Sequence, residues 1–419
     1  MMEKFKIHGG RALEGSLRVQ GAKNSVLPIL AASILVKGES HLQNCPDLKD
    51  VDAAMSILRH LGCTVSRTGK DVHIDSATLT RCDIPDDLMR EMRSSVIFLG
   101  AILGRAGEAV LSMPGGCELG PRPIDLHLGA LRALGAEIEE TGGNIVCRAD
   151  GLVGAQVNLT SPSVGATENA ILAAVCAAGE TVITNAAREP EIVDLAAFLI
   201  SSGARIQGAG QSTITVQGGG MGKAVTHRVM PDRIVAATYL SAVAFSGGRI
   251  ELLDANPDHI ETVISALGSA GCEIDVTGQT VKLQSSGNLR AISPVITRPY
   301  PGFPTDAQPC LLAAAVKAEG TTVFIENIFQ NRYRYVEELR RMGADIKLEG
   351  RVAVVTGVPR LAGTRVDATD LRGGAALVVA ALGAEGETQI GEVHHVDRGY
   401  DNLEETFRSL GADIRRETD

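Results

Sequence analysis

The sequence predicts an α/β fold built from six copies of one structural unit. The first observation is a phrase close to LxxLGAxI that recurs along the whole chain, from "LRHLGCTV" to "FRSLGADI". Its glycines are spaced by 73, 68, 68, 72 and 68 residues, and they are Gly62, Gly135, Gly203, Gly271, Gly343 and Gly411. The second observation is that each copy contains an Ala-rich stretch ending at a glycine, followed by a short β-branched run. Regular spacing with a repeated order of elements indicates internal duplication.

Within each copy, the Ala-rich stretch reads as a helix and the β-branched run, such as "TVIT" or "TTVFI", as a buried strand. A second helix follows. In the first copy Val51, Ala54, Met55 and Leu58 repeat at i, i+3, i+4 and i+7, which is the spacing of one helix face. The "GAxI" phrase then opens another strand, and hairpin-like strands such as "TITVQ" complete the unit.

The two ends of the chain complement each other. The sixth copy stops at "GADIRRETD" without its closing strands, whereas "KFKIHGG" and "GSLRVQG" precede the first Ala-rich helix. We therefore expect the first ~20 residues to pair with the last copy. If six copies divide into two groups of three, one domain is continuous in the middle of the chain and the other combines both ends.

Composition and charge exclude several classes of protein. The 419 residues are 44% hydrophobic and 21% charged, which is typical of a globular protein of two or three domains. A net charge of −10 argues against nucleic acid or an anionic membrane as the main partner. The N-terminus has no apolar signal region, and the Ala-rich runs are too short to span a bilayer. Eight irregularly spaced cysteines indicate reduced thiols, so we expect a soluble cytoplasmic protein.

The segment "MPGGCELGPRPIDLH", residues 113–127, is longer than its counterparts. From the helix-ending glycine to the glycine of the recurring phrase is 24 residues in the first, third and fourth copies and 28 in the second. Cys117 lies in this Gly/Pro-rich loop with Arg122 nearby, surroundings that can lower a thiol pKa. An incidental thiol in a surface loop is the alternative. Four other cysteines are expected to be small core residues or to lie within Ala-rich helices, namely Cys63, Cys176, Cys272 and Cys310.

The starts of the Ala-rich helices are polar. Acceptors for N-capping are Ser163, Asp232, Asp306 and Asp370. Cations, which are disfavoured at a helix N-terminus, nevertheless stand there as Lys23, Arg93, Arg233 and Arg372. Four such positions indicate helix ends that bind an anionic ligand. His394 and His395 resemble half of a metal site, but no spacing completes it, so we expect structural or solvent-facing histidines and no metal.

These motifs, with "GAKNSVLPIL", "NAAREPEIVD", "MPDRI", "FPTDAQ", "DLRGGAA" and "HVDRGYDN", resemble the UDP-N-acetylglucosamine enolpyruvyl transferases over essentially the whole chain. The resemblance implies two domains, each an inside-out α/β barrel of three βαβαββ units, with the active site in the cleft between them. It assigns residues 1–22 and 231–419 to a discontinuous C-terminal domain and residues 23–230 to a central domain carrying the Cys117 loop.

The resemblance also implies a reaction. Phosphoenolpyruvate and UDP-N-acetylglucosamine would give the 3-enolpyruvyl ether and phosphate through a tetrahedral ketal, without a metal or organic cofactor. Cys117 would be the proton donor and form a covalent adduct, and Asp306 would be the base, with Lys23 and Arg398 also catalytic. Phosphoenolpyruvate would contact Lys23, Asn24, Arg122, Arg372 and Arg398. The nucleotide sugar would contact Asp306, Arg93, Arg122, Pro123, Ile124, Asp125, Leu126, Ser163, Val164, Gly165 and Ile328. Arg332 and Asp370 are two further candidates.

Three alternatives compete with this reading. A sister enzyme acting on shikimate 3-phosphate would share the fold but lack the cysteine loop. A catalytically idle paralogue could bind the nucleotide sugar and regulate cell-wall synthesis. An RNA-end-processing enzyme built on related repeats is disfavoured by the acidic charge.

Overall fold

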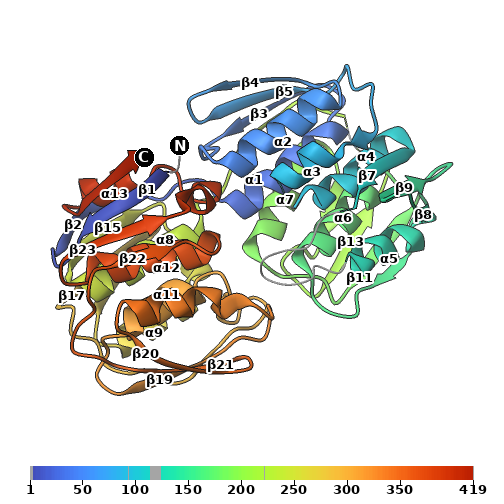
Figure 1. Cartoon of the computed structure of the whole chain (residues 1–419). Coiled ribbons are helices and arrows are strands. Elements are labelled where there is room, and N and C mark those ends of the chain that lie inside the picture. Colours follow the sequence, from blue (N-terminus) through green and yellow to red (C-terminus); the bar gives the residue numbers. More distant parts are fainter. Residues whose placement is uncertain (1–2, 93, 114–123, 221, 419) are drawn as a thin grey trace. The chain divides into compact units, whose positions relative to one another are not determined.

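Two compact units make up the fold. The computed structural model describes residues 3–92, 94–113, 124–220 and 222–418. Unit 1 joins the two ends of the chain and holds residues 3–20 and 231–418, whereas unit 2 holds the described residues between 21 and 230. The colours of Figure 1 show the discontinuity directly, because blue N-terminal strands lie among the orange and red elements of unit 1.

Each unit contains three four-stranded sheets within the described residues. In unit 1 the strand orders are β22 (Arg365–Asp367), β23 (Glu387–Gly391), β1 (Glu3–His8), β24 (Asp413–Thr418); β16 (Glu273–Thr277), β17 (Thr280–Ser285), β15 (Gly248–Leu253), β2 (Leu13–Arg18); and β18 (Val295–Ile296), β19 (Thr321–Ile325), β21 (Val352–Thr356), β20 (Asp345–Glu349). In unit 2 they are β14 (Val225–Arg228), β3 (Glu39–Gln43), β5 (Asp71–Asp75), β4 (Thr64–Thr68); β6 (Asp83–Ile84), β7 (Glu108–Ser112), β9 (Asn144–Arg148), β8 (Glu137–Thr141); and β10 (Gln156–Asn158), β11 (Glu180–Thr184), β13 (Thr213–Gln217), β12 (Arg205–Gln207).

All six sheets share one pattern of pairing. One edge strand is parallel to its neighbour, as β18 is to β19, and the remaining pairs are antiparallel. Burial alternates along the strands, so that β19 reads exposed, buried, half-buried, buried, half-buried. One face of each sheet is therefore packed and the other is open, as a period of two residues requires. The predicted six-fold repeat is confirmed at this level.

The helices form an inner and an outer set. The inner helices are buried almost all round and are α1 (Lys23–Ala32), α4 (Phe98–Ala106), α6 (Val164–Ala174), α8 (Arg233–Ser246), α10 (Gln308–Ala315) and α12 (Leu371–Leu382). In unit 1, α8, α10 and α12 all contact one another. Small alanines permit this close approach, which explains why the cores need few aromatic residues. The predicted α/β fold with buried helices inside the sheets is confirmed.

The outer helices are amphipathic or short. They are α2 (Lys49–His60), α3 (Asp86–Glu91), α5 (Asp125–Ala133), α7 (Pro190–Ser201), α9 (Glu261–Ser269), α11 (Val336–Arg341) and α13 (Leu403–Ser409). In α2, Val51, Ala54, Met55 and Leu58 are all buried, as their spacing predicts. No helix in the described stretches is both long and apolar enough to cross a membrane.

The N-terminal strands go to two different sheets. β1 lies between β23 and β24, with Phe5 opposite both Ile390 and Arg416, so it supplies the strand that the sixth copy lacks. β2 instead pairs in parallel with β15 of the fourth copy. The expectation that both strands join the last copy is therefore wrong for β2. In each sheet of the described residues one edge strand is parallel to its neighbour, and β2 takes that position beside β15.

The cysteines of the described residues are all free. Cys63, Cys272 and Cys310 are buried, as expected for small core residues. Cys176 is only half-buried and follows the end of α6 by two residues, so its placement within the Ala-rich helix is wrong. Cys117 lies outside the described residues.

Candidate active site

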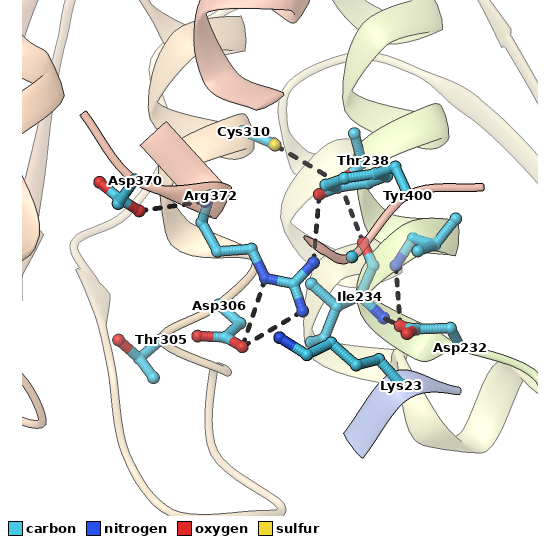
Figure 2. A network of polar contacts seen from close by, with 12 residues as sticks. Lys23, Asp232, Ile234, Thr238, Thr305, Asp306, Cys310, Asp370, Arg372 and Tyr400 are labelled. Atoms are coloured by element: carbon cyan, nitrogen blue, oxygen red, sulfur yellow. Dashed lines mark hydrogen bonds and ion pairs between the residues drawn. The ribbon is translucent and has the colours of Figure 1, made fainter. Parts of the chain in front are cut away.

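A carboxylate held by two buried guanidinium groups forms the centre of the candidate site in unit 1. Figure 2 shows one of these contacts, between Asp306 and Arg372. Asp306 Oδ1 accepts a hydrogen bond from Arg332 Nη2 at 2.7 Å, and Asp306 Oδ2 lies 3.3 Å from both Nε and Nη2 of Arg372. The arginine side chains are 1% and 3% exposed, whereas that of Asp306 is 27% exposed. Two cations against one carboxylate leave a local positive charge beside a carboxylate that a solute can reach.

Asp306 does not cap α10, contrary to the sequence expectation. The helix begins at Gln308 with Ala307 as its N-cap residue and no side-chain cap. Charge-assisted hydrogen bonds to two guanidinium groups are stronger than a bond to a neutral backbone N–H, which explains why the carboxylate turns to the arginines.

The other capping predictions in unit 1 are confirmed. Asp232 Oδ1 accepts from Ile234 N at 2.8 Å and Val235 N at 3.0 Å. Asp370 Oδ1 accepts from the backbone N–H of Arg372 and of Gly373, both at 3.0 Å. These bonds satisfy amides that a helix start leaves without partners, and they fix the first turns of α8 and α12.

Arg332 is fixed by a relay of polar contacts. It begins the short 3₁₀ helix η4 (Arg332–Tyr335), and its Nε donates to Thr305 Oγ1 at 3.2 Å. Thr305 in turn donates to Glu326, which accepts from the backbone N–H of Ile328 at 2.8 Å. The guanidinium carbon also lies 4.7 Å from the centroid of the Phe329 ring. Within the described part of the chain, Nη1 of Arg332 is buried without a hydrogen-bond partner.

Arg372 is fixed from its other side by Tyr400. Its Nη1 donates to the Tyr400 hydroxyl at 3.3 Å, and that oxygen lies 2.8 Å from Thr238 Oγ1. Burial raises the pKa of Tyr400, so the phenol stays neutral. Burial alone would lower the pKa of Arg372, but the adjacent Tyr400 oxygen and the Asp306 carboxylate raise it overall. Arg372 therefore remains a fixed cation.

The segment after Arg398 is held by an amide from the N-terminal part of unit 1. Arg398 ends the 3₁₀ helix η5 (Val393–Arg398) and is half-buried. The side chain of Gln20 donates to Gly399 O at 3.3 Å and accepts from Asp401 N at 2.9 Å. Gln20 is itself buried, so it fixes the backbone just beyond Arg398.

In unit 2, Lys23 is the first residue of α1 and is buried. Its Nζ lies 2.7 Å from Oδ2 of Asp50, which is 1% exposed. No side chain caps this helix. Ser25 donates to Asp194 Oδ2 at 2.5 Å, and His227 Nε2 lies 3.0 Å from Asp194 Oδ1. The half-buried Asn24 thus stands between two side chains that are each anchored to a carboxylate.

A second group of predicted residues gathers where α5 meets α6. Ser163 caps α6 through a 3.4 Å bond from Ala166 N, and Val164 and Gly165 form its first turn. A Cβ at Gly165 would lie 2.8 Å from His127 Cε1, so only glycine allows this approach. His127 belongs to α5, the helix that begins at Asp125 and includes Leu126.

Asn169 fixes the position of His127 against Gly165. Its Nδ2 lies 2.8 Å from His127 Nδ1 and 2.9 Å from Val96 O, while its Oδ1 accepts from Gly100 N at 2.6 Å. One side chain therefore connects α4, α5 and α6. Ile124 adjoins the start of α5 and is half-buried.

The remaining predicted residues divide into two sets. Ile328 is 40% exposed on the segment between β19 and η4, and its N–H is fixed by Glu326. Arg233 is buried in the first turn of α8, with its guanidinium 5.7 Å from the Tyr300 ring centroid. Outside the described residues lie Arg93, Cys117, Arg122 and Pro123.

Sequence reasoning missed several residues that support the site. Tyr400 and Thr305 stand inside the quoted motifs "HVDRGYDN" and "FPTDAQ", which gave a signal for both. Glu326 and Gln20 had none, because their contacts, to backbone groups and in the case of Glu326 also to Thr305, are not revealed by the sequence.

Comparison with known proteins identifies what this arrangement is similar to. The family described as EPSP synthase (3-phosphoshikimate 1-carboxyvinyltransferase) matches residues 7–407. UDP-N-acetylglucosamine 1-carboxyvinyltransferase 2 of Caldanaerobacter subterraneus is 51% identical over 415 residues, covering 99% of this chain and all of the relative. UDP-N-acetylglucosamine 1-carboxyvinyltransferase of Zymomonas mobilis is 48% identical over 424 residues, covering 99% of both chains.

Solved structures of enolpyruvyl transferases have a similar fold. The enolpyruvyl transferase NikO from Streptomyces tendae superimposes with a TM-score of 0.89 at 27% identity, over 100% of this chain and 99% of the other. EPSP synthase from Acinetobacter baumannii gives a TM-score of 0.74 at 21% identity, over 99% of this chain and 100% of the other, which is a likeness of fold alone. The resemblance found in the motifs is thereby confirmed.

Proposed function

The chain belongs to the EPSP synthase family of enolpyruvyl transferases, and from this premise we propose that it transfers the enolpyruvyl group of phosphoenolpyruvate to the 3-hydroxyl of UDP-N-acetylglucosamine. The names of its 44–51% identical relatives support the nucleotide sugar as acceptor. The observation that carries the proposal is the partly exposed Asp306 carboxylate fixed by buried Arg332 and Arg372.

The reaction proceeds by addition and elimination. The sugar 3-oxygen attacks C2 of phosphoenolpyruvate while its proton leaves to a base and the C3 methylene gains a proton. This step forms a tetrahedral ketal. A proton then leaves C3, the C2–O bond to phosphate breaks, and the enolpyruvyl ether and inorganic phosphate are released. Asp306 takes the proton of the 3-hydroxyl, because it is the carboxylate of the site that a solute can reach.

Fixed cations bind the anionic substrate. Phosphoenolpyruvate carries a carboxylate and a phosphate, which buried guanidinium groups recognise through paired hydrogen bonds. Arg372 and Arg332 serve this purpose beside Asp306, with Asp370 fixing the first turn in which Arg372 stands. Lys23, Asn24, Arg122 and Arg398 complete the set for this substrate.

Cys117 delivers the proton to C3 and can form a covalent adduct with phosphoenolpyruvate. The described cysteines are unsuited to chemistry by comparison. Burial raises the pKa of Cys310 to about 11 and that of Cys45 to about 12, and it raises the pKa of the other five described thiols as well. Their thiolates are therefore scarce near neutral pH.

The nucleotide sugar is bound by a larger set of side chains and backbone groups. The helix start at Ser163, Val164 and Gly165 offers N–H groups to a diphosphate. The adjoining α5 brings Ile124, Asp125 and Leu126, and the segment before η4 brings Ile328. Arg93, Arg122 and Pro123 complete the set. No metal or organic cofactor takes part, and the product enters peptidoglycan synthesis in the cytoplasm.

The test measures inorganic phosphate released from phosphoenolpyruvate with UDP-N-acetylglucosamine, with shikimate 3-phosphate, and with no acceptor. We expect release only with the nucleotide sugar, and its loss in Cys117→Ala. Release with shikimate 3-phosphate would assign the chain to the other activity of its family. Binding of the nucleotide sugar without any release would indicate the catalytically idle paralogue.

A further inference from the structure

We propose that Glu392, His394 and His395 form a binding site for a divalent transition metal such as Zn²⁺, at the opposite end of the 3₁₀ helix η5 from Arg398. Sequence alone favoured structural or solvent-facing histidines at this place, because no third ligand was evident. The structure supplies that ligand. The Glu392 carboxylate and the two imidazoles present one donor atom each, and these atoms all lie within 4.8 Å of one another.

The local backbone explains why the three side chains converge. Glu392 has φ +54°, a left-handed conformation that ends β23 abruptly, and the 3₁₀ helix η5 begins at the next residue. In an extended strand, His394 and His395 would point to opposite faces. In η5 their ring centroids lie 4.1 Å apart, with the ring planes tilted by 35°.

The spacing of the donors suits a metal ion. His394 Nδ1 lies 3.4 Å from Glu392 Oε2. Two ligands at about 2.0–2.1 Å from a tetrahedral Zn²⁺ lie roughly 3.3 Å from each other. His394 and Glu392 are exposed, His395 is half-buried, and the donor atom of His395 lies within 4.8 Å of the other two. Two imidazoles and a carboxylate leave one position for water, a donor set that suits Zn²⁺, Ni²⁺ or Co²⁺ better than Mg²⁺ or Ca²⁺.

Among the described residues the converging donors are these three side chains, and Asp397 of the same 3₁₀ helix is held by Arg416 instead. Asp397 contacts Arg416 at 2.6 and 3.0 Å, and Glu404 contacts the same guanidinium at 2.7 Å. Glu3 contacts it as well, at 2.8 Å. This ion-pair cluster leaves Glu392 to balance the charge of a bound cation.

The experiment titrates the untagged full-length protein with Zn²⁺ by calorimetry and with Co²⁺ by absorption spectroscopy. We expect one Zn²⁺ per chain, and a Co²⁺ spectrum with d–d bands but no thiolate charge-transfer band. His394→Gln and Glu392→Gln should each weaken Zn²⁺ binding at least about tenfold. Mutating a residue that only hydrogen-bonds a metal ligand already lowers metal affinity by about 10–100-fold, and loss of the ligand itself should lower it at least as much. Both side chains are exposed, so the variants should keep the wild-type melting temperature without metal.

His73→Gln is the matched control. His73 stacks on His41 with ring centroids 4.2 Å apart, and His41 Nε2 lies 3.5 Å from Asp71 Oδ1. Within the described residues, however, these side chains do not form a group of three donor atoms that converge on one point. Zn²⁺ affinity should therefore stay within about twofold of wild type. The proposal is overturned if wild type shows no saturable binding, if His394→Gln binds as tightly as wild type, or if Co²⁺ shows a thiolate band. None of these readouts depends on enzymatic activity.

Discussion

The two units share one pattern of strands and helices, yet they bury different charges at their inner helices. Unit 1 encloses arginines, with Arg332 and Arg372 against Asp306. Unit 2 encloses Lys23 with Asp50 and, in α6, the buried carboxyl Glu168. The repeated scaffold therefore sets where helix ends lie, and the residues at those ends decide the chemistry. Four predictions test this contrast, in order of expected effect.

Asp306→Asn should abolish most of the proposed reaction. The amide keeps the shape of the carboxylate but cannot accept the 3-hydroxyl proton, and it removes the negative charge that pairs with two buried guanidinium groups. We expect phosphate release to fall by about 10²–10⁴-fold. The exposed Asp345→Asn in β20 is the control and should retain full activity. Equal rates for Asp306→Asn and wild type would remove the base from the mechanism.

Asp50→Asn should destabilise unit 2. Removing one partner of a buried ion pair takes the Asp50 carboxylate from the buried Lys23 ammonium, at a cost of about 3–5 kcal/mol in the free energy of unfolding. Denaturant unfolding followed by circular dichroism measures the loss. Glu108→Gln breaks the pair with Arg148, whose side chains are 42% and 57% exposed, and should cost only about 0–1 kcal/mol. Similar losses in both variants would contradict the structural importance of the Lys23 pair.

Glu168 should make stability depend on pH. Burial, together with nearby Glu191 and Glu189, raises its pKa from 4.5 to about 8. Because the folded state binds the proton more tightly than the unfolded state, its contribution is fully present below about pH 4.5. It is lost as the pH rises through about 8.

Glu168→Gln has no proton to lose, so it should remove this decline and exceed wild type in stability at pH 9 by the order of a few kcal/mol. Denaturant midpoints from pH 5 to 9 provide the check. Glu180→Gln, at an exposed position of β11, should follow the wild-type curve. A wild-type curve parallel to that of Glu168→Gln would show that folding does not raise the pKa of this carboxyl.

The helix caps should differ in strength between the units. Asp232 accepts two backbone bonds at 2.8 and 3.0 Å, whereas Ser163 accepts one at 3.4 Å. We expect Asp232→Ala to cost about 1–2 kcal/mol and Ser163→Ala about 0.5 kcal/mol. Urea midpoints of the two variants measure the difference. A larger loss for Ser163→Ala would reverse the ranking of the caps.

Much of the fold follows from local sequence signals, because periodicity and glycine positions are local. The buried positions of α2, the strands β11, β13 and β19, and the capping roles of Ser163, Asp232 and Asp370 were all accessible in this way. The partner strand of β2 could not be predicted in this way, because strand pairing depends on which sheet of the folded chain has a free edge.

The candidate site, like the fold, has some features that local sequence predicts and others that only the folded chain reveals. The motifs indicated that Asp306 and Arg372 matter, but the local capping rule misplaced Asp306. Its partners Arg332 and Arg372 are 26 and 66 residues away, so only the folded chain shows that two guanidinium groups compete for its oxygens. Gln20 contacts backbone groups, and Glu326 contacts backbone groups and Thr305. Nothing in the local sequence distinguishes these two residues from other polar residues.

The place of β1 between β23 and β24 has a consequence for synthesis on the ribosome. The chain of unit 2 is complete once residue 230 has emerged, so that unit can fold while translation continues. β1 leaves the ribosome before the other described elements, yet its partners are residues 387–390 and 413–418. At about 5–20 residues per second, this strand waits on the order of 20–80 seconds with both edges unpaired. The last six residues of the described chain therefore complete a sheet whose β1 strand was made before the whole of unit 2.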